Sequence, residues 1–217
     1  MSGPFDMSFD ELPETLPIFP LAGAILLPGA RIPLNIFEPR YLRMTASALR
    51  ESRLIGMIQP LQDDDDGCGD VFSVGCAGRI TSFSETADGR LAIILDGICR
   101  FRVSEELETA EGFRRIVPLW NEFQMDLDAP VDSGDRASLL GALRAYAERT
   151  GLDLDWESID RSETVDIVRV FSMIGPFSPT EKQAIVEAAN LLERTRTLIA
   201  MLDMAVYGAG EGGGLPS

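Results

Sequence analysis

The stretch LPIFPLAGAILLPGARIPLNIFEPRY, from Leu16 to Tyr41, decides how the chain folds. Proline has no backbone donor, so it sits at strand ends, edges and bends rather than inside a hydrogen-bonded ladder. The stretch therefore predicts two short strands, at 16–19 and 32–37, joined by a bent connection at 21–29. The prolines that divide it are Pro17, Pro20, Pro28, Pro33 and Pro39.

Outward from this stretch, the next hundred residues have the composition of a β-rich unit with one helix. Apolar residues fall on one helical face from Pro39 to about Arg53. Asp88-Gly89 is a hairpin turn signal between two strand-like segments. The unit is expected to close near Asn121. Its further predicted strands lie at 54–59, 72–83, 90–103 and 113–119.

The period of the apolar residues becomes helical in the last third of the chain. We expect a linker at 122–134, a helical unit at 135–207, and helices over 135–150 and 162–174. Ser178-Pro179-Thr180-Glu181 has the pattern of a capped helix start. A break is expected near Ala188–Asn190, where Asn190 and Glu193 resemble a second cap. A mobile arm at 1–15 and a disordered glycine-rich tail at 208–217 complete the chain.

The composition restricts the partners. The net charge is −16, and nucleic-acid binding usually needs a basic patch, so we expect no nucleic-acid partner. No apolar run is long enough to cross a membrane, and the first residues lack the pattern of a signal peptide. We therefore expect a cytoplasmic protein with no membrane partner.

The sequence does not contain the common catalytic and metal-binding motifs. It contains no histidine and no phosphate-cradling GxxxxGK[ST] motif. The thiols of Cys68, Cys76 and Cys99 are not spaced as a zinc site and are interpreted as reduced. The acidic run at 62–70 fails the calcium-loop pattern, because Gln62 and Ser73 stand at the first and last ligand positions. We expect no metal, no cofactor, no catalytic residue and no enzymatic activity.

Several motifs together resemble one known family. They are LPIFPL, LLPG, IPLNIFEPRYL, GRITSF, DGRLAIIL, GICRFRV and PFSPTEKQAIVEAANLLERT, in order from Leu16 to Asp203. The set is similar to the N-terminal domain of Lon proteases, especially bacterial proteins made of that domain alone. The matching region contains neither an ATPase nor a protease domain, and Lys182 lies within the N-terminal-domain motif rather than in a catalytic dyad.

The resemblance implies an α+β fold, in which an N-terminal β-rich PUA-like pseudo-barrel with one inserted helix at 16–121 precedes a C-terminal helical bundle. It also implies a non-catalytic module that binds unfolded or degron-bearing polypeptides, as an adaptor, a competitor or a client-binding protein. Its partners would then include components of a protease system. Two alternatives remain open, namely RNA binding through the PUA-like fold and a purely structural or oligomeric role.

The connection between the first two strands supplies the predicted substrate-binding residues, which are Ile25, Leu26, Leu27 and Pro28. Loops are usually polar, whereas this one places three large aliphatic side chains before a Pro-Gly turn. An exposed apolar patch is typical of a protein-interaction surface. We predict such a patch here, and the alternative is that these side chains belong to the core at the open end of the barrel.

Overall fold

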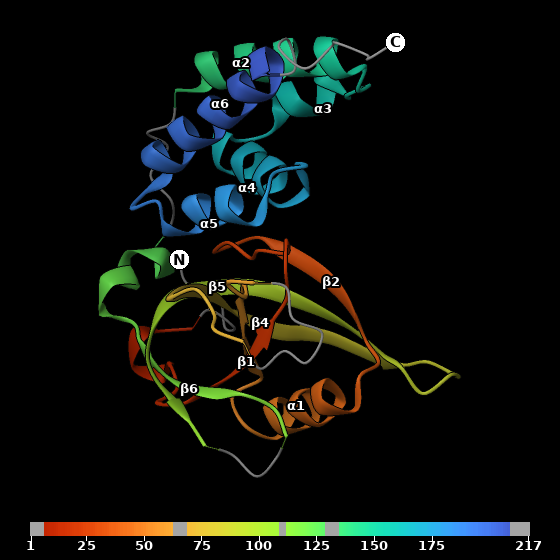
Figure 1. Cartoon of the computed structure of the whole chain (residues 1–217), viewed down its shortest axis with the longest axis vertical. Helices are drawn as coiled ribbons and strands as arrows, with labels where there is room; N and C mark the ends of the chain where they lie inside the picture. The colour runs from red at the N-terminus through yellow and green to blue at the C-terminus, as the bar shows by residue number, and fades with distance from the viewer. Residues whose placement is uncertain (1–6, 63–68, 109–111, 129–134, 209–217) are drawn as a thin grey trace, which may run out of the picture. The chain divides into compact units, whose positions relative to one another are not determined.

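The computed structural model describes residues 7–62, 69–108, 112–128 and 135–208. The chain divides into two compact units, Met1–Ala129 and Pro130–Ser217 (Figure 1). The first unit contains the strands and the second contains helices. The α+β architecture expected from the sequence is confirmed.

The β-rich unit is built on a six-stranded sheet with the order β2-β5-β4-β3-β1-β6. The last strand returns to pair with the second half of β5, so five of the strands close into a barrel and β2 extends from the first half of β5. Only β1 and β3 run parallel. The strands are β1 Leu16–Pro20, β2 Arg31–Ile36, β3 Leu54–Ile58, β4 Val74–Glu85, β5 Leu91–Leu107 and β6 Arg115–Leu119.

The long strand β5 serves two partners because its pairing changes along its length. Its first six residues pair with β2, and Arg102, Val103 and Glu105–Leu107 pair with β6, with a register shift between Val103 and Glu105. Such irregularities bend a strand and increase its twist, which closing a barrel requires. The tip of the β4–β5 hairpin projects beyond the other strands (Figure 1).

The barrel interior is organised around Phe101, which is fully buried. Added Cβ atoms at Gly56 and Gly75 would lie 2.9 Å and 2.6 Å from the Phe101 ring. Both positions therefore have to be glycine for the ring to fit between the strands. The helix α1, Pro39–Arg50, packs against β1 and β3 through a buried face. That face consists of Tyr41, Met44, Thr45 and Ala48.

At both ends of this unit the described residues form short helices where the sequence predicted a linker and a mobile arm. Residues 121–127 form the 3₁₀-helix η2, Asn121–Leu127, where a linker was expected from residue 122. The pairing of Arg100 with Asp126 ties η2 to β5, with Nε and Nη2 donating at 2.8 Å and 2.9 Å. Of the arm expected at 1–15, residues 7–15 are described: Trp120 Nε1 donates to the Pro13 carbonyl oxygen at 3.1 Å, and a 3₁₀-helix η1 spans Phe9–Glu11.

The second unit consists of helices α2 Arg136–Thr150, α3 Trp156–Arg161, α4 Thr164–Ile174, α5 Pro179–Glu187 and α6 Leu191–Gly208. Local signals define their ends. Asp135 and Asp155 cap α2 and α3, and Gly151 ends α2 at a φ of 71°. The capping box of Ser178 with Glu181 is present, and the break expected near Ala188–Asn190 is confirmed.

No helix among the described residues has the length and apolar content needed to cross a bilayer. The predicted disordered tail lies, apart from Gly208, outside the described residues, and so does most of the acidic run at 62–70.

Candidate functional site

A groove of about 510 Å³ opens beside β2 in the β-rich unit. The end of β1 and the residues after it form one wall, and β2 with the start of α1 forms the other. Both walls come from the stretch that decides the fold. The lining residues are Phe19, Pro20, Leu21, Ala22, Pro33, Leu34, Asn35, Ile36, Phe37, Glu38, Arg40, Tyr41 and Pro60.

Two aromatic rings pack against each other in the wall of the groove. The rings of Phe19 and Tyr41 lie 4.3 Å apart at an angle of 50°. The guanidinium of Arg40 lies 4.6 Å from the centre of the Tyr41 ring and pairs with Glu38 at 2.8 Å. Pro39 occupies the first turn of α1, where its preset φ favours the helix. The helix start therefore holds Arg40 and Tyr41 in the groove.

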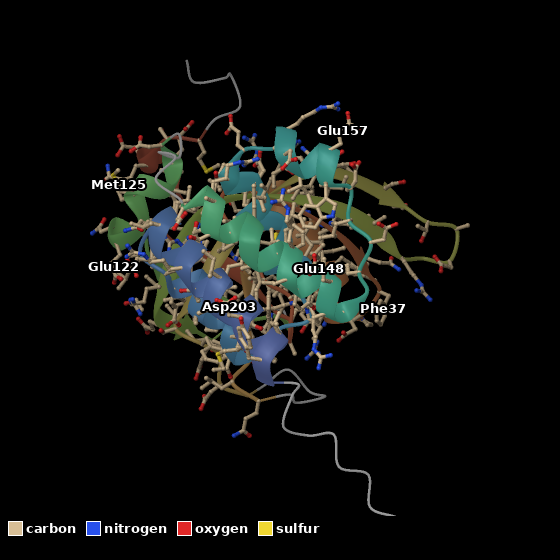
Figure 2. The ribbon with its side chains drawn as sticks, turned by 90° about the horizontal axis from the view of Figure 1, so that it is seen from above. Phe37, Glu122, Met125, Glu148, Glu157 and Asp203 are labelled. Carbon is tan, nitrogen blue, oxygen red and sulfur yellow. The ribbon has the colours of Figure 1, made fainter. Side chains whose placement is uncertain are left out.

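Phe37 lies at the rim and is an exposed large apolar side chain of the groove. Its side chain is 60% exposed, and its ring is labelled in Figure 2. It follows the last residue of β2 directly, which directs it away from the buried Ile36. The Arg90 guanidinium of the β4–β5 hairpin lies 5.6 Å from the centre of the Phe37 ring. An exposed phenyl ring beside an apolar groove is a contact point for another apolar group.

The predicted patch at Ile25–Pro28 is not exposed. All four residues are buried, and Leu26 and Leu27 are 1% and 0% exposed. The connection packs onto β4 and β5 where two glycines leave room. A Cβ at Gly78 would lie 2.6 Å from Leu26 Cδ2, and one at Gly97 would lie 2.1 Å from the Leu27 carbonyl oxygen. The exposed patch is therefore a wrong prediction, whereas the alternative, burial in the core, is confirmed. Contact of these residues with a substrate stays a prediction.

The sequence analysis did not single out Phe37 as a candidate site residue. The motif NIFEPRY was identified, and Phe37 was assigned to a strand, whereas Tyr41 was assigned to the buried face of a helix, where the structure places it. A signal was present, because Pro39 favours the first turn of a helix, so Phe37 lies in the short connection between β2 and α1. Only the surrounding walls show that a groove is formed there.

Cys76 and Cys99, the cysteines among the described residues, are buried and form no disulfide. Burial, together with the nearby charge of Asp126, raises the pKa of Cys99 to about 12. The thiolate is the reactive form, so Cys99 is inert near neutral pH. Within the described ranges, no group of His, Cys, Asp and Glu is arranged to hold a metal ion.

The helical unit carries a second hollow of about 440 Å³ between the end of α2 and the start of α3. The Arg144 guanidinium lies 5.3 Å from the centre of the Trp156 ring at one side of it. The residues that line the hollow are Arg144, Ala147, Glu148, Gly151, Leu152, Asp153 and Trp156.

Residues 15–204 match the family described as the ATP-dependent protease La (LON) substrate-binding domain. The chain belongs to the LON substrate-binding domain family. The match covers both units, which confirms the family resemblance inferred from the motifs.

The relatives of this LON substrate-binding domain chain show how far the likeness extends. Lon protease 2 of Myxococcus xanthus is 26% identical over 112 residues, which are 51% of this chain but 14% of that protein. The chain thus spans only a small part of the length of its curated relatives.

Two solved structures share the fold. A Lon N-terminal domain protein from Xanthomonas campestris has a TM-score of 0.60 at 24% identity and covers 86% of this chain and 97% of its own. The N-terminal domain of a Mycobacterium avium complex Lon protease has a TM-score of 0.63 at 18% identity, with 87% and 98% covered. At these identities the likeness establishes the fold alone.

Proposed function

We propose that this chain is a recognition module that binds unfolded or degron-bearing polypeptides in the groove beside β2. The observation that carries the proposal is the exposed Phe37 at the rim of that groove, in a member of a substrate-binding family. The module acts on behalf of a protease system as an adaptor, a competitor or a client-binding protein. It contributes binding and no chemistry of its own.

The energetics of the groove support a polypeptide ligand. Burying one phenylalanine side chain contributes about 1.5–3 kcal/mol, so Phe37 alone supplies a useful part of a micromolar interaction. The buried rings of Phe19 and Tyr41 pack against each other in the wall of the groove, so this part of the groove is preformed, which lowers the entropic cost of binding. An apolar side chain of an unfolded chain would bind against the exposed ring of Phe37.

Charge within the groove favours an uncharged segment over RNA. The cation of Arg40 is paired with Glu38, and the cation of Arg90 at the rim is paired with Asp88. Binding of a nucleic acid requires cations that are available to phosphates. We therefore do not propose RNA as a partner. The buried free thiols fit a reducing compartment, and we place the module in the cytoplasm as part of the same proposal.

The test compares two exposed phenylalanines of the same unit. Phe37 and Phe83 are 60% and 53% exposed, but only Phe37 lines the groove. Fluorescence anisotropy measures binding of labelled, reduced and carboxymethylated α-lactalbumin, which is permanently unfolded. The substitution Phe37→Ser should weaken binding about tenfold or more, and Phe83→Ser should leave the affinity within about twofold.

Both variants should keep the melting temperature of the parent, since exposed substitutions usually change stability by about 0.5 kcal/mol or less. Equal affinities for all three proteins, or no binding of the unfolded probe by the parent, would reject the groove as the recognition site.

A further inference from the structure

The strand β2 has one open backbone edge. Among the described residues it pairs with β5 alone. The backbone N–H of Gly97 donates to the Ala30 carbonyl oxygen at 2.8 Å, so that carbonyl points toward β5. Backbone polar groups of successive strand residues point to alternate sides. The backbone groups of Arg31, Pro33 and Asn35 are therefore directed away from β5.

An independent contact on β5 gives the same alternation. Thr81 Oγ1 donates to the Ile94 carbonyl oxygen at 3.4 Å, so the backbone of Ile94 faces β4. Its neighbour Leu95 then faces β2, where it is paired with Ile32. Ile32 therefore faces β5, and its neighbours in β2 face the open side.

Pro33 lies at a position of β2 where the missing backbone N–H leaves no hydrogen bond to β5 unmade. Pro33 has no N–H, and the open side is the side on which no partner strand needs one. The edge thus offers two donors, from Arg31 and Asn35, and three acceptors, from these residues and Pro33. An open edge of this kind is a template for another strand.

The groove lies along this same edge, because Pro33 to Phe37 form one of its walls. The charged side chains at the edge and beside the groove form pairs of opposite charge, although the whole chain has a net charge of −16. The edge and the groove are therefore electrostatically complementary to a neutral segment and not to a strongly charged one. The three matched pairs are Arg31 with Asp96, Arg40 with Glu38 and Arg90 with Asp88.

We propose that the groove holds an extended polypeptide segment that adds to the open edge of β2 as a further strand. This inference rests on the proposed function and specifies its substrate class. The segment is neutral, places apolar side chains at alternate positions toward Phe37 and the groove, and has no proline at the positions whose N–H groups face β2. Main-chain hydrogen bonds give the affinity, and the alternate side chains give the preference.

The first experiment measures hydrogen exchange of individual backbone amides by NMR in the whole protein. The probe is a capped peptide of about ten residues in which valine alternates with threonine, which exceeds the length of β2. At saturating probe, the exchange rates of the Arg31 and Asn35 amides should fall to about one tenth or less of their values in the free protein. A hydrogen-bonded amide exchanges only when the hydrogen bond opens.

The outcomes separate this inference from the proposed function. If the probe binds and both amides exchange as fast as in the free protein, strand addition is overturned while polypeptide binding stands. If neither the probe nor unfolded α-lactalbumin binds, both are overturned. Protection at both amides supports strand addition.

A pair of variants at one residue gives the second test. Asn35→Pro removes one donor from the open edge, whereas Asn35→Ala keeps it. Affinity for the probe should be about tenfold or more lower in Asn35→Pro than in Asn35→Ala, from one lost hydrogen bond and the ring of proline against the added strand. Equal affinities would overturn the inference. If Asn35→Pro does not fold, the exchange measurement on the unaltered protein decides.

Discussion

At the scale of single residues, glycines decide where the large side chains lie. Gly78 and Gly97 leave the space that Leu26 and the backbone of Leu27 occupy. The loop is also tied to β5 by its backbone, because Gly29 donates to the Gly97 carbonyl oxygen at 2.8 Å. The apolar loop at Ile25–Pro28, which the sequence analysis predicted to be an exposed interaction patch, is therefore part of the core.

This placement predicts that Leu26→Asp combined with Leu27→Asp unfolds the β-rich unit. Burying an unpaired carboxylate costs several kcal/mol, and the total stability of a domain is only about 5–15 kcal/mol. Circular dichroism and thermal unfolding would measure the loss. The matched exposed change, Phe37→Asp, should retain the parent's melting temperature within a few degrees. A stable, cooperatively melting double variant would contradict the burial of the loop.

At the scale of elements, arginine contacts join α1 to β6. Arg115 of β6 donates to both carboxylate oxygens of Glu51, at the end of α1, at 2.9 Å and 3.0 Å. The hydrogen bonds from Arg115 are the largest cause that lowers the pKa of Glu51. A carboxyl with a lowered folded-state pKa contributes stability above its unfolded-state pKa, and that contribution is lost as the pH falls through the folded-state value.

We therefore predict that Glu51→Gln reduces the free energy of unfolding at neutral pH by about 1 kcal/mol or less, since the pair is partly exposed. The difference from the parent should shrink as the pH falls below the ordinary glutamate pKa of 4.5. Urea unfolding at several pH values would measure it, with Glu85→Gln as the exposed control. A difference that stays constant down to the acid transition would contradict this role.

At the scale of the whole molecule, the groove belongs to one unit, and the chain has no histidine and no phosphate-binding loop motif. We predict that the purified protein neither hydrolyses ATP nor cleaves casein. Coupled phosphate-release and fluorescent-casein assays would measure both activities. Nucleotide-stimulated proteolysis that disappears on substitution of one residue of this chain would contradict the prediction.

The sequence by itself determined the elements that depend on neighbouring residues. Local sequence patterns predicted three features of the helices. They are the helix start at Pro39, the Ser178–Glu181 capping box and the helix break after Glu187. The α+β class followed from the change of apolar period, and the family followed from motifs in a fixed order. Each of these signals lies within a short segment of the chain, so it can be recognised without knowledge of the tertiary structure.

Only the tertiary structure decided what is buried and what is open. The burial of Ile25–Pro28 depends on glycines about fifty to seventy residues away, and the groove appears only when β1, β2 and α1 are brought together. The anchoring of η2 likewise depends on Arg100 meeting Asp126. Such contacts join residues far apart in the chain, and the apolar pattern that predicts burial cannot distinguish a loop that packs on a barrel from one that meets a partner.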